Sequence, residues 1–191
     1  MLVPFRTTVC GIEELGEHCA AGVTHVLSIL DPAAPEPAAF AAFSAHAKLE
    51  LRFDDVIEEV PDKAVPRRQH VEEILALGHD LSAEPADAAH LLVHCHAGIS
   101  RSTASMLLIL AQARPERSGA ELMGEILRIR AKAWPNLRIV EFGDALLGRN
   151  GDLIAAVPLA YRTQLERRPE LQRYFIDAGR GREVEKAGKV L

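Results

Sequence analysis

The 191-residue chain has no apolar run long enough to cross a membrane, because no stretch approaches 18 uncharged apolar residues. It also has no excess of positive charge: 22 Lys and Arg residues stand against 27 Asp and Glu residues, for a formal net charge of −5. Proteins that bind nucleic acid are usually basic, so no nucleic-acid partner is expected. The first residues lack the charged, apolar and cleavage regions of a signal peptide, and we therefore expect a cytoplasmic protein.

Cysteine and large aromatic residues are also scarce. Three cysteines cannot form a paired disulfide framework, and the spacing of Ile12, Leu15 and Cys19 predicts that Cys19 lies on the core face of a helix. One Trp and two Tyr give no obvious aromatic wall for a ligand. No second group of Cys and His follows Cys95 at zinc-ligand spacing, so neither a metal nor another cofactor is expected.

The most informative segment runs from His94 to Ser102 and reads His-Cys-His-Ala-Gly-Ile-Ser-Arg-Ser. An apolar run leads into Cys95, five residues separate it from Arg101, and an apolar segment with helical character begins there. A strand, a tight loop and a helix start, in this order, point backbone N–H groups and a helix N-terminus at one small volume. The pattern predicts a nucleophilic thiol inside a phosphate cradle.

The residue types suit this chemistry. A cysteine at a helix N-terminus beside a cation ionises more readily than a free cysteine, which makes Cys95 the expected nucleophile. The guanidinium of Arg101 can grip a phosphate with two parallel hydrogen bonds. The Ser102 hydroxyl is expected to donate to the sulfur and ease its departure, and His94 to support the loop from behind. The expected phosphate-binding residues are His96, Ala97, Gly98, Ile99, Ser100 and Arg101.

This loop resembles the signature loop of the protein tyrosine phosphatase superfamily. Its form, HCxAGxSRS, is most similar to the dual-specificity branch, and a looser resemblance covers roughly residues 20 to 145. The resemblance implies that Cys95 is the nucleophile, that Arg101 binds phosphate and that an upstream Asp is the general acid. The expected function is hydrolysis of phosphate monoesters through a phosphocysteine intermediate, with a phosphorylated protein or small phosphate ester as the partner.

The general acid is expected just after a strand. Residues 48–53 alternate strictly between apolar and polar, which predicts a half-buried strand that runs into Asp54 and Asp55. Dual-specificity relatives carry their acid at such a place, and phosphatases of the regenerating-liver type have a similar Phe-Asp-Asp. The resemblance therefore favours Asp55, with Asp54 as the alternative. Neighbours in a strand point to opposite faces, so only one is expected to reach the cradle and the other to cap or hold the loop.

Other functions stay open from the residues alone. Relatives that act on phosphoinositides often carry Lys in the loop, and its absence here favours phosphotyrosine or phosphoserine and phosphothreonine in proteins. A rhodanese-like sulfurtransferase also sets a Cys loop against anions, but it needs no upstream acid. A phosphate-ester-binding module without turnover would not need Cys95, Arg101 and an acid together. Trp134-Pro135-Asn136 is similar to the acid loop of larger tyrosine phosphatases, yet it follows the cradle and lacks the Asp.

Strands and helices are expected to alternate along the chain. This order predicts a single α/β domain with a central, mainly parallel sheet flanked by helices, similar to protein tyrosine phosphatases. Cys95 would then lie at the carboxyl end of a strand, where such sheets bind ligands. The expected strands are 1–10, 23–30, 48–53 and 90–95, and the expected helices are 11–21, 37–47, 66–81, 101–113, 118–133 (opened by a Ser118 capping box) and 135–147.

The C-terminal part differs in composition. We expect residues 1–150 to form the phosphatase domain and residues 151–191 to form a helical extension of one or two helices with a flexible end. The glycine- and charge-rich end begins at Gly179. An additional structural helix is the preferred interpretation, and a contact with a second copy of the chain or an arm near a neighbouring active site is the alternative. The sequence leaves the oligomeric state open.

Overall fold

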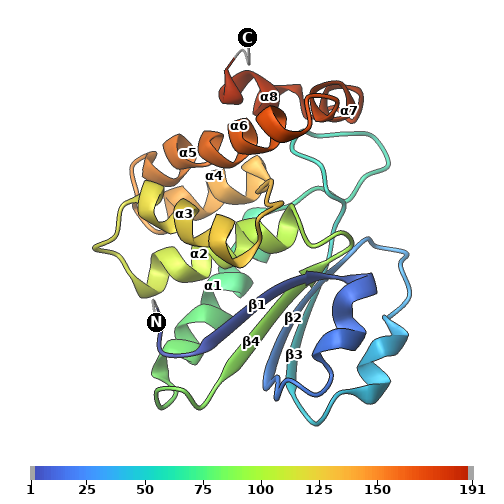
Figure 1. Ribbon diagram of the computed structural model, residues 1–191, viewed down its shortest axis with the longest axis vertical. Coiled ribbons are helices and arrows are strands. Elements are labelled where there is room, and N and C mark those ends of the chain that lie inside the picture. Colours follow the sequence, from blue (N-terminus) through green and yellow to red (C-terminus); the bar gives the residue numbers. More distant parts are fainter. Residues whose placement is uncertain (1–2, 189–191) are drawn as a thin grey trace.

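The computed structural model of the chain describes residues 3–188. Its four strands form one fully parallel sheet in the order β1-β4-β2-β3 (Figure 1). The strands are β1 (Arg6–Gly11), β2 (His25–Leu30), β3 (Ala47–Arg52) and β4 (His90–Cys95). The helices are η1 (Ile12–His18), η2 (Ala38–Ala42), α1 (Arg68–Ala83), α2 (Arg101–Ala113), α3 (Gly119–Ile129), α4 (Leu137–Leu146), α5 (Asp152–Ala156), α6 (Pro158–Arg167), α7 (Leu171–Asp177) and α8 (Gly181–Ala187). The expected fold class is confirmed.

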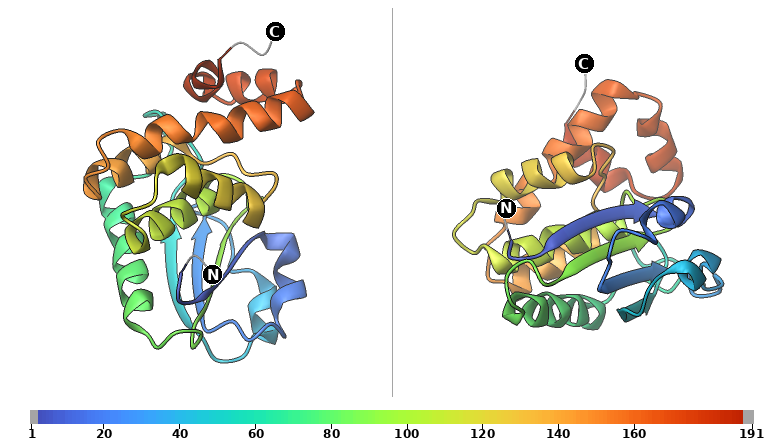
Figure 2. Two further views of the ribbon diagram at one scale, coloured as in Figure 1. Left: turned by 60° about the vertical axis from the view of Figure 1, so that its left-hand side comes forward. Right: turned by 60° about the horizontal axis from the view of Figure 1, so that its bottom comes forward.

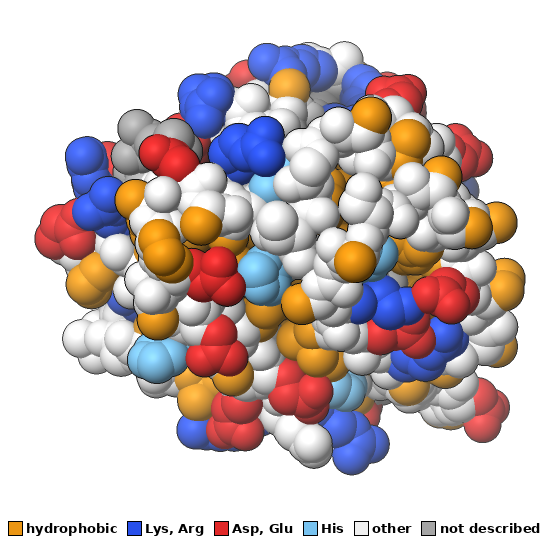
Figure 3. All heavy atoms as spheres, turned by 90° about the horizontal axis from the view of Figure 1, so that it is seen from below, with side chains coloured by type: hydrophobic (Ala, Val, Ile, Leu, Met, Phe, Trp, Pro, Cys, Tyr) orange, Lys and Arg blue, Asp and Glu red, His pale blue; other side chains and the backbone are white. Residues whose placement is uncertain are grey.

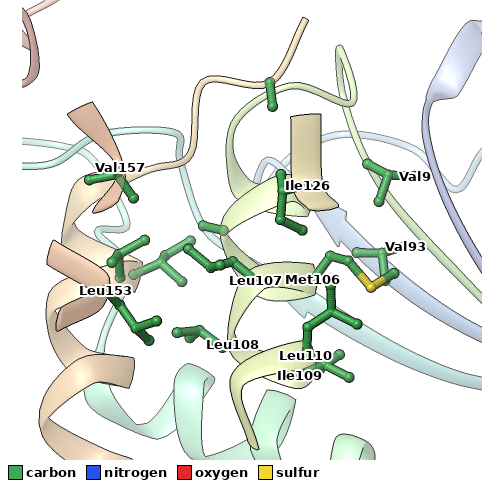
Figure 4. Packing of buried hydrophobic residues seen from close by; sticks show 14 of the residues in the cluster. Val9, Val93, Met106, Leu107, Leu108, Ile109, Leu110, Ile126, Leu153 and Val157 are labelled. Carbon is green, nitrogen blue, oxygen red and sulfur yellow. The ribbon is translucent and has the colours of Figure 1, made fainter. Parts of the chain in front are cut away.

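The two faces of the sheet are covered unequally. Side chains alternate along a strand, so Val93 packs with the main helical core while its neighbour Leu92 packs on the other face. The main core is built around α2, whose Met106 and Leu107 lie between the sheet and the later helices (Figure 4). The second face carries a smaller core around Leu92, which the 3-10 helices η1 and η2 cover with Leu15 and Phe40. Both central strands are thereby buried on two sides, as continuous apolar runs in parallel sheets usually are.

The helices α6, α7 and α8 form an outer layer beyond α3, α4 and α5 (Figures 1 and 2). In Figure 1 the loop that follows β3 rises beside α7 at the upper right. On the opposite face of the molecule, acidic, basic and hydrophobic side chains are interspersed (Figure 3). Within residues 3–188, no helix combines the length and the apolar character that a membrane span requires.

Several expected elements are confirmed. The strand β4 and the helix α2 have the predicted bounds, and Ser118 caps α3 by accepting a hydrogen bond from the backbone N–H of Glu121. The helix expected from residue 135 begins at Leu137, because Asn136 is its N-cap and accepts from the backbone N–H of Ile139 at 3.2 Å. The first two residues of the first expected strand lie outside the described part of the chain.

Two expected helices are wrong over much of their length. Residues 37–47 contain only the five-residue 3-10 helix η2, and residues 11–21 contain the 3-10 helix η1. The segment before η2 carries three prolines, each of which fixes φ and removes a backbone N–H donor, and Pro37 is extended with ψ of 123°. A short turn suffices there because Phe40 and Phe43 need only to pack on the edge of the second, smaller core.

The C-terminal extension also departs from expectation. It holds four short helices from Asp152 to Ala187, where one or two were expected. The flexible end predicted from Gly179 is wrong within the described residues, because residues 181–187 form α8 and the side chains of Arg180 and Glu183 are buried. Residues 189–191 lie outside the part that the structure describes. The domain division after residue 150 stays a prediction.

Candidate active site

The carboxyl ends of all four strands meet around the loop that joins β4 to α2. Cys95 is the last residue of β4, only 2% exposed, and α2 begins at Arg101. The Ser102 Oγ lies 3.2 Å from the Cys95 Sγ, within hydrogen-bond distance for sulfur. The structure therefore brings the expected nucleophile, the expected phosphate ligand and the expected hydroxyl donor together at the start of one helix.

Outside donors hold the carbonyl groups of this loop. The backbone N–H groups of Ile12 and Trp134 donate to the carbonyl oxygens of His96 and Ile99 at 2.9 and 2.7 Å. The guanidinium of Arg130 donates to the carbonyl oxygens of the two residues between them, Ala97 and Gly98. In a planar trans peptide the N–H points opposite to the C=O, so the amides of residues 97–100 point to the other side. That geometry suits an anion, which needs several N–H donors converging on it.

Gly98 makes this turn possible. Its φ is +68°, a backbone conformation that residues other than glycine rarely adopt. A Cβ at this position would lie 2.2 Å from the backbone carbon of Cys10 and 2.4 Å from the backbone nitrogen of Gly11. The loop packs against the end of β1 so closely that only glycine fits.

Arg101 is buried and only partly satisfied. Its side chain is 3% exposed, its Nη1 donates to the Phe53 carbonyl oxygen at 2.6 Å, and the same nitrogen forms an ion pair with the Asp31 Oδ1 at 2.7 Å. These partners follow β3 and β2, so two further strand ends fix the guanidinium. Its Nε has no hydrogen-bond partner among the described residues. A buried donor without a partner is costly, which marks this edge of the guanidinium as the place for an oxyanion.

Asp55 lies in a dense set of donors. Its Oδ1 accepts from the Ser100 Oγ at 2.7 Å and from the Asn136 Nδ2 at 2.8 Å, and its Oδ2 accepts from the Arg180 Nη1 at 3.0 Å. Burial raises the pKa of this carboxyl group, but the charges of Arg180 and Arg101 and the two neutral hydrogen bonds outweigh burial and hold the pKa below its usual value.

Asp54 is bound within its own loop. Its Oδ2 accepts from the backbone N–H of Ala64 at 2.8 Å, and its Oδ1 pairs with the Lys63 Nζ at 3.0 Å. Its backbone N–H donates to the Ala64 carbonyl oxygen at 2.7 Å, which closes the base of the loop from 54 to 64. Both aspartates line the same cavity as Cys95, and within residues 3–188 only Asp55 has a side-chain hydrogen bond to a residue of the phosphate loop, Ser100.

His94 lies behind the loop and is fully buried. Its Nε2 is 2.8 Å from the Ser28 Oγ of β2. Burial is the main cause and the charges of Lys48 and Arg101 add to it, and together they lower the pKa of His94 to about 4, so the ring is neutral near neutral pH. The neutral ring thus joins β4 to β2 behind the loop, and its supporting role stays a prediction.

A cavity of about 330 Å³ opens over Cys95 and the loop. The C-terminal extension forms one wall of it, where Tyr174 is 65% exposed and Phe175 is buried. Three aspartates and three cations share the lining, so the cavity has no large excess of either charge. Within residues 3–188, no three His, Cys, Asp or Glu residues gather in a way that would hold a metal ion.

Sequence reasoning missed several residues of this site. Arg180 and Asn136 both contact Asp55, and Arg130 holds the loop carbonyls. The segment Trp134-Pro135-Asn136 gave a signal, since it is similar to an acid loop. In the structure it contributes no carboxyl group, and its asparagine donates to the carboxylate of Asp55 instead. Nothing local marks Arg180, because its partner lies 125 residues away in the chain.

No protein-family model matches the sequence, and no curated protein sequence matches it. Solved structures do match. Human DUSP28 is 20% identical with a TM-score of 0.55, covering 78% of this chain and 97% of that one. A human tyrosine phosphatase-like serine/threonine/tyrosine-interacting protein is 16% identical with a TM-score of 0.55, covering 78% and 95%. DUSP15 is 21% identical with a TM-score of 0.54, covering 78% and 89%.

The matches to solved structures compare backbone folds, whereas the signature loop compares residue identities. The parallel sheet with its flanking helices matches the dual-specificity phosphatases over most of their length. Within it, Cys95 ends the strand β4, and Arg101 and Ser102 begin the helix α2 across one short loop, as in the HCxxGxxRS motif. The chain therefore has the protein tyrosine phosphatase-like fold of the dual-specificity phosphatases.

Proposed function

We propose that the protein is a cysteine-dependent phosphomonoester hydrolase. The observation that carries this proposal is the unpartnered Nε of the buried Arg101, which begins α2 at the end of the loop that follows Cys95. The loop amides face away from their outward carbonyl groups, and Asp55 is bonded to the loop through Ser100. A tetrahedral oxyanion would satisfy the amides and the guanidinium together.

In the first step the Cys95 thiolate attacks phosphorus in line with the leaving oxygen. The new S–P bond forms as the P–O ester bond breaks, and the Asp55 carboxyl group gives its proton to the leaving oxygen. Arg101 and the amides of residues 97–100 hold the three equatorial oxygens. The products are a free alcohol and a phosphocysteine.

In the second step water attacks the phosphocysteine. Asp55, now ionised, takes a proton from the water, and the S–P bond breaks to release inorganic phosphate. Ser102, whose Oγ lies 3.2 Å from the sulfur, donates a hydrogen bond to the departing thiolate. The two proposed steps use no metal and no other cofactor.

The lowered pKa of Asp55 bears on the two steps in opposite ways. An ionised carboxylate is ready to act as the base of the second step, whereas the first step needs its proton. A phosphate dianion bound at Arg101 would offset one of the two cations that lower this pKa and so favour protonation. Substrate binding is therefore expected to prepare the acid.

The substrate class that the cavity fits best is a phosphorylated protein side chain. The loop holds no Lys, and the three aspartates of the lining balance Lys63, Arg101 and Arg180. A polyphosphorylated inositol would need a stronger positive field. The exposed ring of Tyr174 at the cavity offers an apolar surface to an aromatic leaving group, which favours phosphotyrosine among the candidates.

The test is hydrolysis of p-nitrophenyl phosphate by the wild type and by the Cys95→Ser and Arg101→Ala variants. We expect activity in the wild type and a loss of at least about 10³-fold in both variants, because nucleophile and transition-state ligand act as a unit. Cys19→Ser, which changes a thiol outside the cavity, is the matched control and should keep full activity. Full activity in Cys95→Ser would refute the mechanism.

A substrate panel separates the remaining alternatives. Phosphotyrosine, phosphoserine and phosphothreonine peptides, inositol phosphates and thiosulfate are offered to the same preparation. Turnover of thiosulfate alone would assign a sulfurtransferase. Tight phosphopeptide binding without phosphate release would assign a binding module.

A further inference from the structure

The C-terminal extension reaches into the candidate active site through one buried arginine. Arg180 lies between α7 and α8, and its side chain is 4% exposed. Its Nη1 donates to the Asp55 Oδ2 at 3.0 Å, and its Nη2 donates to the Ser100 Oγ at 2.9 Å. One guanidinium thus contacts both the candidate acid and the hydroxyl that ties this acid to the phosphate loop.

Arg180 is itself held in a rigid frame. The Glu183 carboxylate accepts from its Nε and its Nη2, both at 2.8 Å, in a bidentate pair. The same carboxylate accepts from the Trp134 Nε1 at 2.6 Å and from the backbone N–H of Leu137 at 2.9 Å. Glu183 is fully buried, and its carboxylate is bound at the start of α4. The guanidinium of Arg180 is therefore held by a fixed buried group and not by a mobile surface side chain.

The contacts to Asp55 divide between its two oxygens. Ser100 and Asn136 donate to Oδ1, and Arg180 donates to Oδ2. Donors on one oxygen alone leave a carboxylate free to rotate, whereas an arginine on the second oxygen fixes its plane. The charged groups that act on this carboxylate are Arg180 and Arg101.

We propose that Arg180 is a positioning residue for the Asp55 carboxyl group, and that α7 and α8 are thereby a working part of the active site. The inference rests on the proposed function, because it assigns Arg180 a part in the acid step of that reaction. Among the described residues, Arg180 makes no hydrogen bond to the Cys95 sulfur, and it acts through Asp55. Four of its five N–H groups donate to Asp55, Glu183 and Ser100, which holds the guanidinium in place beside the carboxyl group.

The kinetic test compares two leaving groups. Phenyl phosphate has a basic leaving oxygen that needs a proton from the acid, and p-nitrophenyl phosphate needs it far less. We expect Arg180→Met to lower kcat for phenyl phosphate by roughly ten- to a hundredfold, within the 10²–10⁴ that general acids supply, and to lower kcat for p-nitrophenyl phosphate by less than about threefold. Equal losses with both substrates would overturn the proposal.

Matched variants separate position from charge and fold. Arg173→Met removes an exposed arginine of α7 whose recorded partner is Asp177, and it should change neither rate. Arg180→Lys keeps a point charge without the planar fork and should restore only part of the phenyl phosphate rate. In the double variant Arg180→Met, Asp55→Asn, the loss should be no greater than in Asp55→Asn alone. An additive loss would show that Arg180 acts independently of Asp55.

A measurement without turnover distinguishes this inference from the proposed function. The carboxyl carbon signal of Asp55 is followed by NMR against pH in the wild type and in the folded Arg180 variants, with Arg180→Lys serving if Arg180→Met fails to fold. The titration midpoint should move to higher pH in the variants. An unmoved midpoint refutes the positioning role even in an active enzyme. A moved midpoint in a protein that hydrolyses no phosphate ester refutes the proposed function and keeps the contact.

Discussion

At the scale of single residues, the proposed mechanism requires one carboxylate, that of Asp55, to act first as an acid and then as a base. Asp55 is bonded by two neutral donors and one arginine, and those bonds favour its ionised form. The residue pattern after the third strand, together with the family resemblance, placed Asp55 next to the cradle ahead of Asp54. The structure places both at the cavity and ties only Asp55 to Ser100. The choice between them stays a prediction that rates must decide.

The pH dependence of the leaving-group effect tests this choice. The ratio of kcat/KM for phenyl phosphate to that for p-nitrophenyl phosphate reports the protonated fraction of the acid in the free enzyme. The pKa of Asp55 is held below its usual value, so the range from about pH 5 to about pH 7 lies above it. The protonated fraction therefore falls throughout this range as pH rises, and the ratio should decrease steadily with it.

The control for this profile is Asp55→Asn. Its ratio should be low and independent of pH, since no proton is left to give. A pH-dependent ratio that survives in Asp55→Asn and disappears in Asp54→Asn would assign the acid to Asp54.

At the scale of elements, the sequence predicted those helices and strands whose bounds depend on local residue patterns. The strand β4, the helix α2 and the Ser118 cap follow from period, length and capping chemistry, and they are where the sequence put them. The segment from 37 to 47 could not be predicted in this way. Its alanines favour a helix, but Pro37 and the packing of Phe40 and Phe43 on a small core allow only a 3-10 turn.

The Ser118 cap gives a test at this scale. Ser118→Ala removes the side-chain acceptor for the backbone N–H of Glu121, and we expect the free energy of unfolding to fall by about 1 kcal/mol. Urea unfolding followed by circular dichroism measures it. Ser118 lies outside the cavity over Cys95, so kcat should not change. Ser44→Ala, at an exposed loop position, should leave stability unchanged, and an equal loss in both variants would argue against the cap.

At the scale of the whole molecule, residues from the whole length of the chain meet at one edge of the sheet. The ends of β1, β2, β3 and β4 supply the loop and its anchors, and the extension supplies Arg180. The sequence predicted the strand ends, because parallel sheets place them together. It could not predict the extension's part, since the charged pattern of Arg180 and Glu183 reads as a solvated surface until the fold buries both.

The buried carboxylate of Glu183 carries the prediction at this scale. Glu183→Gln breaks the bidentate pair with Arg180 and leaves a buried guanidinium short of charge, so we expect the free energy of unfolding to fall by about 3 kcal/mol. Urea denaturation provides the measurement, and Glu185→Gln on the exposed side of the same helix is the control. Equal stability of the two variants would contradict the frame described for Arg180.

The chain's single tryptophan stands at the seam between the extension and the rest of the fold. Trp134 is 1% exposed, and its ring stacks on that of Phe175 in α7 at 3.9 Å and 12°. Its intrinsic fluorescence is therefore a built-in optical gauge of whether α7 is docked. A red shift of the emission maximum at denaturant concentrations too low to unfold the sheet would show that the extension undocks separately, and it would do so without an attached label.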